Sequence, residues 1–144
     1  MKIIKHNLKY LIFVIIWMAV IWFLSSRSVL NVGLIGWADV LFKKLAHVFV
    51  YTMLSLFLTK LFIGYKNWDS DEDKLSFVIS LLLVFFLGTL YAIGDEIHQS
   101  FVPNRNPSLL DIGFDVTGLF FGLIWGLKLA TNKLRTSFKV LFTR

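Results

Sequence analysis

The chain has 144 residues, of which 57% are hydrophobic and 17% aromatic, and its mean hydropathy is +0.73. Soluble domains are only about 45–50% apolar, so this composition excludes an ordinary soluble protein and indicates a membrane protein. The length allows only a few spans of about 20 residues each and leaves no room for a separate soluble catalytic domain, while the lack of cysteine excludes disulfides and thiolate chemistry.

Four apolar stretches have the length of a membrane-crossing helix, about 20 residues. They cover approximately residues 8–24, 45–63, 75–93 and 109–129, and the connections between them are short. The sequence therefore predicts an all-α integral membrane protein with four transmembrane helices. Residues 29–42, a moderately apolar stretch interrupted by Gly33 and Gly36, are compatible with a short re-entrant or interfacial segment between the first two helices.

The basic residues are divided unevenly between the two ends of these spans. Of the 15 lysines and arginines, only Arg27, Lys43, Lys44 and Arg105 fall on the side of the first and third connections. The positive-inside rule therefore predicts that both termini lie in the cytoplasm and that the third connection lies outside. The net charge of +6 follows from this bias and from attraction to anionic lipid headgroups, so no nucleic-acid partner is predicted.

Polar residues begin the second predicted helix, in the stretch KKLAHVFVY. Lys44, His47 and Tyr51 stand at positions i, i+3 and i+7, which places them on one face of the helix near its outer end. We expect these three side chains to meet the same polar partners.

A second polar group follows the third span, in DEIHQ. If the helix continues that far, its spacing pairs Asp95 with His98 and Gln99 and points Glu96 in another direction. Ionisable residues at the edge of a membrane span mark function by default, so these four residues are candidates for a site.

The connection VPNRNPS holds an arginine between two prolines. Pro103 and Pro107 restrict the backbone of the residues before them, and Asn106 is predicted to cap the fourth helix with Pro107 as its first helical residue. A guanidinium held in this way suits a carboxylate or a phosphate. Arg105 is therefore expected to pair with Asp111, to bind a phosphate, or to do both.

Two carboxylates lie near the start of the fourth helix. Asp111 and Asp115 are one turn apart and continue the face that carries Gly118, Gly122 and Gly126, a small-residue pattern that allows another helix to approach closely. The carboxylates are therefore expected to face the bundle. Because two carboxylates repel in a low-dielectric interior, either one is protonated at neutral pH or a cation such as Arg105, Lys44 or a metal ion neutralises them.

These motifs resemble the signature of the VanZ-like family of small bacterial membrane proteins. The family has Lys, His and Tyr on one helix, then D-E-x-H-Q-x-F-x-P-x-R, and then S-x-x-D; here KKLAHVFVY, DEIHQSFVPNR and SLLD match, and so does FLSS at residues 23–26. The likeness covers approximately residues 22–122. Asn104 stands where glycine is common in the family, and Asp115 stands where asparagine is common.

The resemblance implies a single VanZ-like transmembrane domain over residues 1–144. The family is named for a protein associated with low-level resistance to teicoplanin, a lipoglycopeptide that carries a fatty acyl chain. This implies a cell-envelope context, in which the outward-facing polar site acts on or binds a lipid, a lipid-linked phosphate or a lipoglycopeptide. It implies no reaction mechanism.

Two classes of function stay open. The first is a membrane-embedded hydrolase or transferase acting on a lipid phosphate, for which catalytic and substrate-binding roles can be assigned. The catalytic candidates are His98, Glu96, Asp95, His47 and Asp111, and the substrate-binding candidates are Lys44, Tyr51, Gln99, Arg105 and Asp115.

The second class is a non-catalytic membrane interaction protein in which the same residues form a closed polar network between the helices. No cofactor is predicted. A divalent cation held by histidines and carboxylates is a variant of the enzyme hypothesis, although the spacing matches no HExxH-type motif. The predicted partner is a membrane lipid or a lipid-linked substrate, and the residues specify no oligomeric state.

Overall fold

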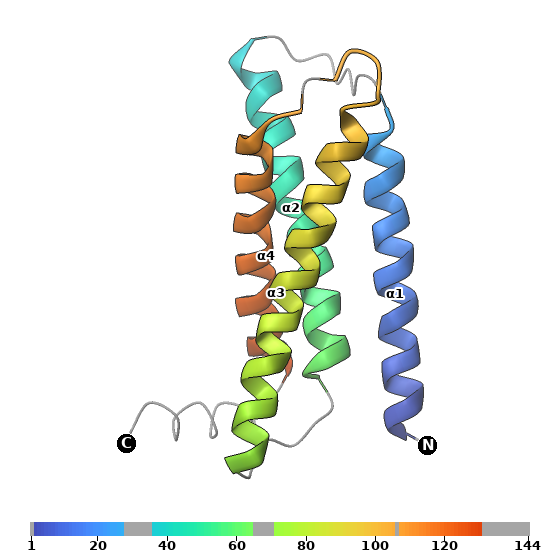
Figure 1. Cartoon of the computed structure of the whole chain (residues 1–144), viewed down its shortest axis with the longest axis vertical. Helices are drawn as coiled ribbons and strands as arrows, with labels where there is room; N and C mark the ends of the chain where they lie inside the picture. Colours follow the sequence, from blue (N-terminus) through green and yellow to red (C-terminus); the bar gives the residue numbers. More distant parts are fainter. Residues whose placement is uncertain (1, 28–35, 65–70, 106, 131–144) are drawn as a thin grey trace, which may run out of the picture.

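The four predicted spans form four helices in the structure, a computed structural model that describes residues 2–27, 36–64, 71–105 and 107–130. They are α1 (Lys2–Ser25), α2 (Trp37–Phe62), α3 (Asp71–Gln99) and α4 (Leu109–Ala130). In the bundle, α1 and α3 run in one direction and α2 and α4 in the other (Figure 1). Each helix is long and apolar enough to cross a membrane, and the described residues contain no strand. The prediction of an all-α membrane protein with four spans is confirmed.

At the end of the bundle where α2 begins and α3 ends, these two helices extend well beyond their predicted apolar cores. α2 begins at Trp37 rather than at residue 45, and α3 continues past residue 93 to Gln99. Gly36 precedes α2 with a φ of 65°, a left-handed conformation that glycine adopts without steric cost. Residues 37–42 therefore belong to α2 and not to a separate segment, and the rest of the predicted re-entrant stretch, residues 29–35, lies outside the described residues.

The glycine face of α4 packs directly on α2. A Cβ atom on Gly122 would overlap the backbone oxygen of Thr52, and one on Gly126 would lie 2.7 Å from the Cβ of Thr59. Gly118 meets the same helix through the backbone of Val48. The predicted close approach of two helices along this face is confirmed, with α2 as the partner.

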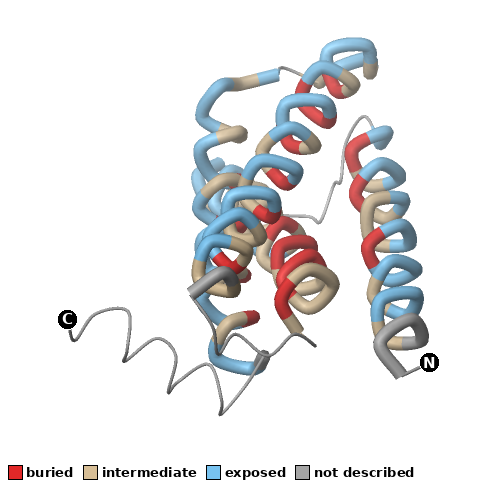
Figure 2. The backbone as a smooth tube through the Cα atoms, turned by 60° about the horizontal axis from the view of Figure 1, so that its bottom comes forward, coloured by how far each residue is buried: buried red, intermediate tan, exposed pale blue. Residues whose placement is uncertain are grey.

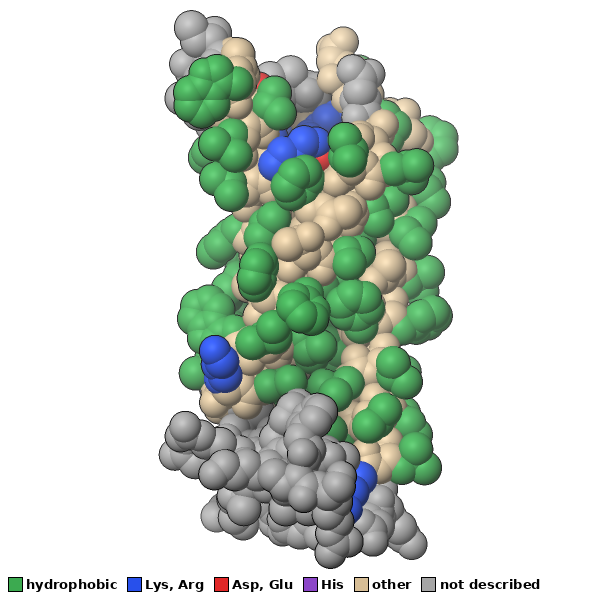
Figure 3. Space-filling model, turned by 90° about the vertical axis from the view of Figure 1, so that its left-hand side faces the viewer, with side chains coloured by type: hydrophobic (Ala, Val, Ile, Leu, Met, Phe, Trp, Pro, Cys, Tyr) green, Lys and Arg blue, Asp and Glu red, His purple; other side chains and the backbone are tan. Residues whose placement is uncertain are grey.

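The outer surface of the bundle is apolar along most of its length. Buried side chains face the centre and exposed positions face outward on all four helices (Figure 2). The flank in Figure 3 is mostly hydrophobic through its middle, with lysine or arginine side chains toward both ends and acidic side chains near the upper end alone. This distribution is that of a bundle surrounded by lipid, with polar chemistry kept to the membrane edge.

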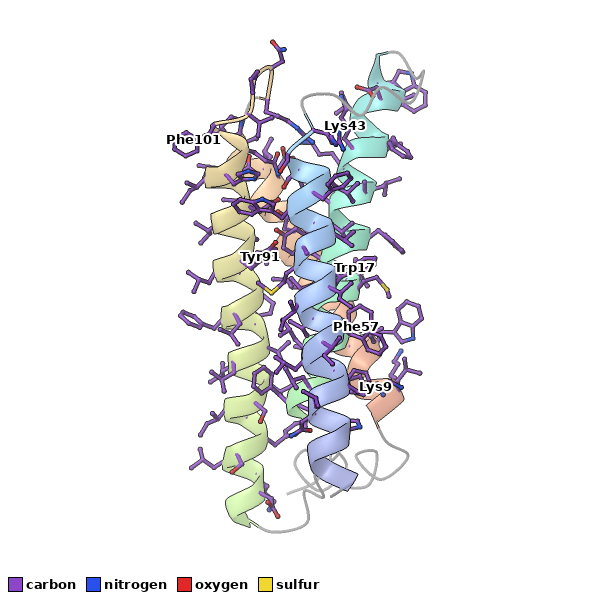
Figure 4. All side chains as sticks on the ribbon, turned by 90° about the vertical axis from the view of Figure 1, so that its right-hand side faces the viewer. Lys9, Trp17, Lys43, Phe57, Tyr91 and Phe101 are labelled. Carbon is purple, nitrogen blue, oxygen red and sulfur yellow. The ribbon has the colours of Figure 1, made fainter. Side chains whose placement is uncertain are left out.

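α1 is held to the rest of the bundle by aromatic side chains rather than by small residues. The indole Nε1 of Trp17 donates to the backbone oxygen of Val50 at 2.7 Å, and the hydroxyl of Tyr91 donates to the backbone oxygen of Met18 at 2.6 Å. Trp17 also contacts Phe57 edge-on, at 5.9 Å between ring centroids. Figure 4 shows Trp17 and Tyr91 on the two sides of α1.

Candidate functional site

All ten site residues predicted from the sequence lie at one end of the bundle, where α1 and α3 end and α2 and α4 begin (Figure 1). Ser25 joins them through a hydrogen bond. We call these eleven residues the polar cluster: Ser25, Lys44, His47, Tyr51, Asp95, Glu96, His98, Gln99, Arg105, Asp111 and Asp115.

Asp95 is the most completely hydrogen-bonded carboxylate of the cluster. It is 2% exposed and accepts hydrogen bonds from the Ser25 hydroxyl at 2.6 Å and the Gln99 amide at 2.9 Å. The continuation of α3 to Gln99 confirms the predicted pairing of Asp95 with Gln99, whereas His98 makes no bond to Asp95. The sequence reasoning did not name Ser25 as a site residue, although its place in FLSS at the end of the first span was the available signal.

Two polar pairs join α2 to α4 near their starts. The Lys44 ammonium pairs with Asp111, and Nδ1 of His47 lies 2.8 Å from a carboxylate oxygen of Asp115. Lys44 and His47 share one face of α2, and the two aspartates share one face of α4, so the parallel helices bring the pairs together. The prediction that Arg105 is the counter-charge of Asp111 is wrong, because Lys44 occupies that position.

Arg105 instead fastens the third connection to the end of α1. Its guanidinium donates to the backbone oxygen of Arg27 at 3.0 Å and to that of Leu24 at 3.4 Å. Carbonyls at a helix C-terminus lack partners within the helix, so a fork of donors suits them. The preceding residue, Asn104, has a φ of 62°. Asparagine tolerates this left-handed conformation better than most other residues with a side chain.

Glu96 joins the end of α3 to the start of α4. One of its carboxylate oxygens accepts a hydrogen bond from the backbone N–H of Ser108, whose hydroxyl in turn accepts one from the backbone N–H of Leu110 at 3.2 Å. Ser108 therefore caps α4, which begins at Leu109. Pro107 lies before the helix, contrary to the prediction that it is the first helical residue, and the predicted cap Asn106 lies outside the described residues.

His98 is stacked against α1. Its imidazole lies parallel to the indole of Trp22, with 3.6 Å between ring centroids and 16° between the planes. No sequence pattern distinguishes Trp22 from the other tryptophans among the five of the chain. This contact places His98 between α1 and α3, away from the Lys44 and His47 pairs.

Four buried polar atoms of the cluster make no hydrogen bond within the described chain. They are Tyr51 Oη, Glu96 Oε2, His98 Nδ1 and Asp115 Oδ2; the one further atom of this kind among the described residues is Thr89 Oγ1. Buried polar atoms in native proteins are nearly always paired, so such a concentration at one place requires an explanation.

A cavity of about 70 Å³ opens beside the cluster, between α1, α2 and α3. Its polar lining comes from Ser25, Lys43, His47, Tyr51, Asp95 and Arg105. A single water needs roughly 10–15 Å³ measured in the same way, so the cavity has room for several waters or for a small polar group.

No group of three or more His, Cys, Asp or Glu side chains in the described parts of the chain is arranged to hold a metal ion. The pairs that form instead are carboxylate with lysine and carboxylate with histidine. The divalent cation considered from the sequence stays a prediction.

Comparison with protein families gives a match over most of the chain. The family described as VanZ/LLP1 matches residues 10–129. The chain belongs to the VanZ/LLP1 family. The match includes all ten predicted site residues and at least part of every helix, so the polar cluster of this VanZ/LLP1 protein lies wholly within the family region. Neither the curated proteins nor the solved structures contain a match to the chain.

Proposed function

We propose that the polar cluster binds the polar head of an amphiphile taken from the membrane, such as a lipid, a lipid-linked cell-envelope precursor or an acylated glycopeptide. The proposal rests on the four unpaired buried atoms. A network that only held helices together would satisfy its members, because each unpaired buried polar atom costs ~1–3 kcal/mol. A ligand that pairs with these atoms removes that cost.

The charges of the cluster favour a head that donates hydrogen bonds. The cluster holds four carboxylates and two permanent cations, namely Asp95, Glu96, Asp111 and Asp115 against Lys44 and Arg105. Lys44 is already paired with a carboxylate, and Arg105 is engaged by backbone carbonyls. The unpaired oxygens of Glu96 and Asp115 have the capacity to accept hydrogen bonds from a ligand. An amine or a hydroxyl therefore suits this environment better than a phosphate, which would meet carboxylates.

The test uses Glu96→Gln, which keeps the oxygen bonded to Ser108 and replaces only the unpaired oxygen with a donor. The matched control is Asp73→Asn, because Asp73 lies at the opposite end of α3 from Glu96. Full-length protein is extracted from bacterial membranes, and its retained amphiphiles are identified by native mass spectrometry, with added teicoplanin as a second probe. We expect wild type and Asp73→Asn to retain an amphiphile and Glu96→Gln to retain at least tenfold less.

Absence of any retained amphiphile from the wild type would instead support a structural network. In that case Glu96→Gln should lower the thermal stability of the protein, because it changes a member of the network. Under the binding proposal the ligand-free stability stays within ~1 kcal/mol of wild type, since the substituted atom has no partner to lose.

We propose that this site lies at the outer face of the membrane, because most of the basic residues fall at the opposite ends of the spans. The test compares Pro103→Cys in the third connection with Asn7→Cys near the start of α1, two exposed positions in a chain without other cysteines. An impermeant thiol reagent added to intact cells should label only the cysteine at position 103. Labelling at position 7 alone would place the cluster on the cytoplasmic face.

A second candidate function is acid/base catalysis on the bound head, favoured by the pair of His47 and Asp115. An imidazole oriented by a carboxylate 2.8 Å away is a frequent arrangement of a general base, and His47 also lines the cavity. His47→Gln separates the two functions. If the protein is an enzyme, this variant retains the amphiphile unchanged and the wild type releases a converted product; if it only binds, neither preparation converts the amphiphile.

A further inference from the structure

An apolar groove of about 500 Å³ lies between α1 and α3, with α2 behind them. It runs from Leu11 to Trp22 on α1 and from Leu87 to Gly94 on α3, and Leu54 and Leu58 of α2 contribute to its floor. Figure 4 shows α1 in front of α2, with Tyr91 of α3 directed toward α1. The groove has the size of an ordinary small-molecule site, ~300–1,000 Å³.

The length of the groove corresponds to one leaflet of a bilayer. A helix rises 1.5 Å per residue, so the distance along α1 from Leu11 to Trp22 is ~16 Å. The hydrocarbon core of a bilayer is ~30 Å thick, and the groove therefore covers about half of it. An extended acyl chain from a single leaflet has this reach.

One end of the groove meets the polar cluster. Trp22 closes the α1 side and stacks on His98, whose Nδ1 is unpaired. On the α3 side, Gly94 is the last lining residue and directly precedes Asp95. A molecule with its chain in the groove would thus have its head at the buried carboxylates.

We propose that this groove holds the acyl chain of a single-chain amphiphile with an amine or hydroxyl head, which enters sideways from the bilayer between α1 and α3. The inference rests on the proposed function and adds a binding site for the acyl chain to the proposed site for the polar head. Three observations favour this occupant: the apolar lining within a membrane span, the leaflet length, and an end rich in unpaired acceptors.

Gly94 provides a substitution that fills the groove without disturbing the helix. An added Cβ at this position meets nothing within 4 Å, and the same is true of Gly113 on α4, which does not line the groove. Both are exposed helical glycines close to the polar cluster. Gly94→Leu and Gly113→Leu are therefore matched, and each should raise helix propensity equally.

The experiment measures binding of tetradecylamine and hexylamine to full-length protein in detergent micelles by native mass spectrometry. The two probes share a head and differ in the length of the chain. Wild type and Gly113→Leu should bind tetradecylamine at least tenfold more tightly than hexylamine. Gly94→Leu should lose this preference and bind both amines equally.

Equal tetradecylamine affinity for Gly94→Leu and Gly113→Leu would overturn the groove assignment and leave the proposed function intact. Binding of neither amine by the wild type, together with no retained amphiphile, would overturn both. A dimer in micelles that Gly94→Leu dissociates would show that a second copy of the chain covers the groove. If Gly94→Leu fails to fold, Leu90→Trp in the groove and Phe121→Trp on α4, both 54% exposed in the wild type, replace the pair.

Discussion

The α2–α4 and α1–α3 contacts show opposite ways of packing helices at the same depth of a membrane. Between α2 and α4, glycines bring the backbones together, and the Ser55 hydroxyl donates to the backbone oxygen of Leu119 at 2.7 Å. Between α1 and α3, leucine and aromatic side chains hold the helices apart and leave the groove. Helices in lipid associate through close packing and hydrogen bonds. The α2–α4 contact combines close backbone packing with such a bond, and we call it the closed contact. We call the α1–α3 contact, which leaves the groove, the open contact.

The polar cluster lies across the ends of both contacts, and this position gives its two halves different properties. The Lys44–Asp111 and His47–Asp115 pairs stand on the closed contact, where two helices are fixed relative to each other. His98 stands at the end of the open contact. A binding site needs a rigid part that sets geometry and an accessible part that admits the ligand, and this arrangement supplies one of each.

The largest loss of stability is expected from replacing a glycine at the close contact between α2 and α4. Gly122→Leu puts side-chain atoms where the Thr52 carbonyl lies, so the helices must separate. We expect a loss of stability at or above the upper end of the ~1–3 kcal/mol typical of overpacking. Thermal unfolding in detergent measures it, with Gly94→Leu as the comparison. Similar stabilities for the two variants would contradict the difference between the contacts.

A smaller effect is expected from breaking the ion pair at the end of the closed contact. Lys44→Met leaves Asp111 without its partner, and these side chains are 24% and 13% exposed. Because the pair is only partly buried, we expect a cost of about 2 kcal/mol, below the ~3–5 kcal/mol of a fully buried pair. Lys43→Met removes a more exposed pair with Asp39 and should cost ~0–1 kcal/mol. Equal unfolding midpoints for Lys44→Met and Lys43→Met would contradict the expected difference between the two ion pairs.

The two aspartates of α4 should respond differently to the same substitution. Asp111→Asn removes the charge that faces Lys44, and we expect a cost of ~1–3 kcal/mol. Asp115→Asn keeps an oxygen for His47 and replaces an unpaired oxygen, so it should stay within ~1 kcal/mol of wild type. Protein level in the membrane and thermal unfolding measure both. Equal damage would indicate that the carboxylates act together, most simply as ligands of a cation.

The smallest loss of stability is expected from removing the stack of Trp22 and His98 at the end of the open contact. Trp22→Leu removes the parallel contact with His98 and should cost ~0.5–1.5 kcal/mol. Trp125→Leu is the control, because Trp125 is 53% exposed and Trp22 is 49% exposed. The intrinsic fluorescence of single-tryptophan variants reports the local environment. A shift of Trp22 emission after His98→Ala is expected, and none for Trp125.

The helices were predictable because span length and hydropathy follow directly from the thickness of a bilayer. The early start of α2 at Trp37 was not, because the mixed polar and apolar residues at 37–44 carry no span-like signal. The face that Asp111 and Asp115 share with the glycines was also predictable, since it depends only on helical spacing.

The partners of the polar residues were less accessible to sequence reasoning. Arg105 is close to Asp111 in the sequence, and this proximity favoured the prediction that the two residues pair. In the structure, α4 packs on α2 so that Asp111 pairs with Lys44 instead. The Trp22–His98 stack depends in the same way on how α1 lies against α3. Spacing along one helix fixes which residues share a face, but not which face of another helix lies opposite. The roles of the ten predicted site residues stay predictions.

The way in which α1 is fastened has a consequence for how related chains can diverge. Besides the Ser25–Asp95 hydrogen bond and the Trp22–His98 stack, its ties join side-chain donors to main-chain acceptors: Trp17 to Val50, Tyr91 to Met18, and Arg105 to Leu24 and Arg27. A carbonyl is present whatever the residue, so the accepting positions can change identity freely while the donors cannot. During evolution, α1 can therefore exchange its lipid-facing and accepting residues and still dock in the same place.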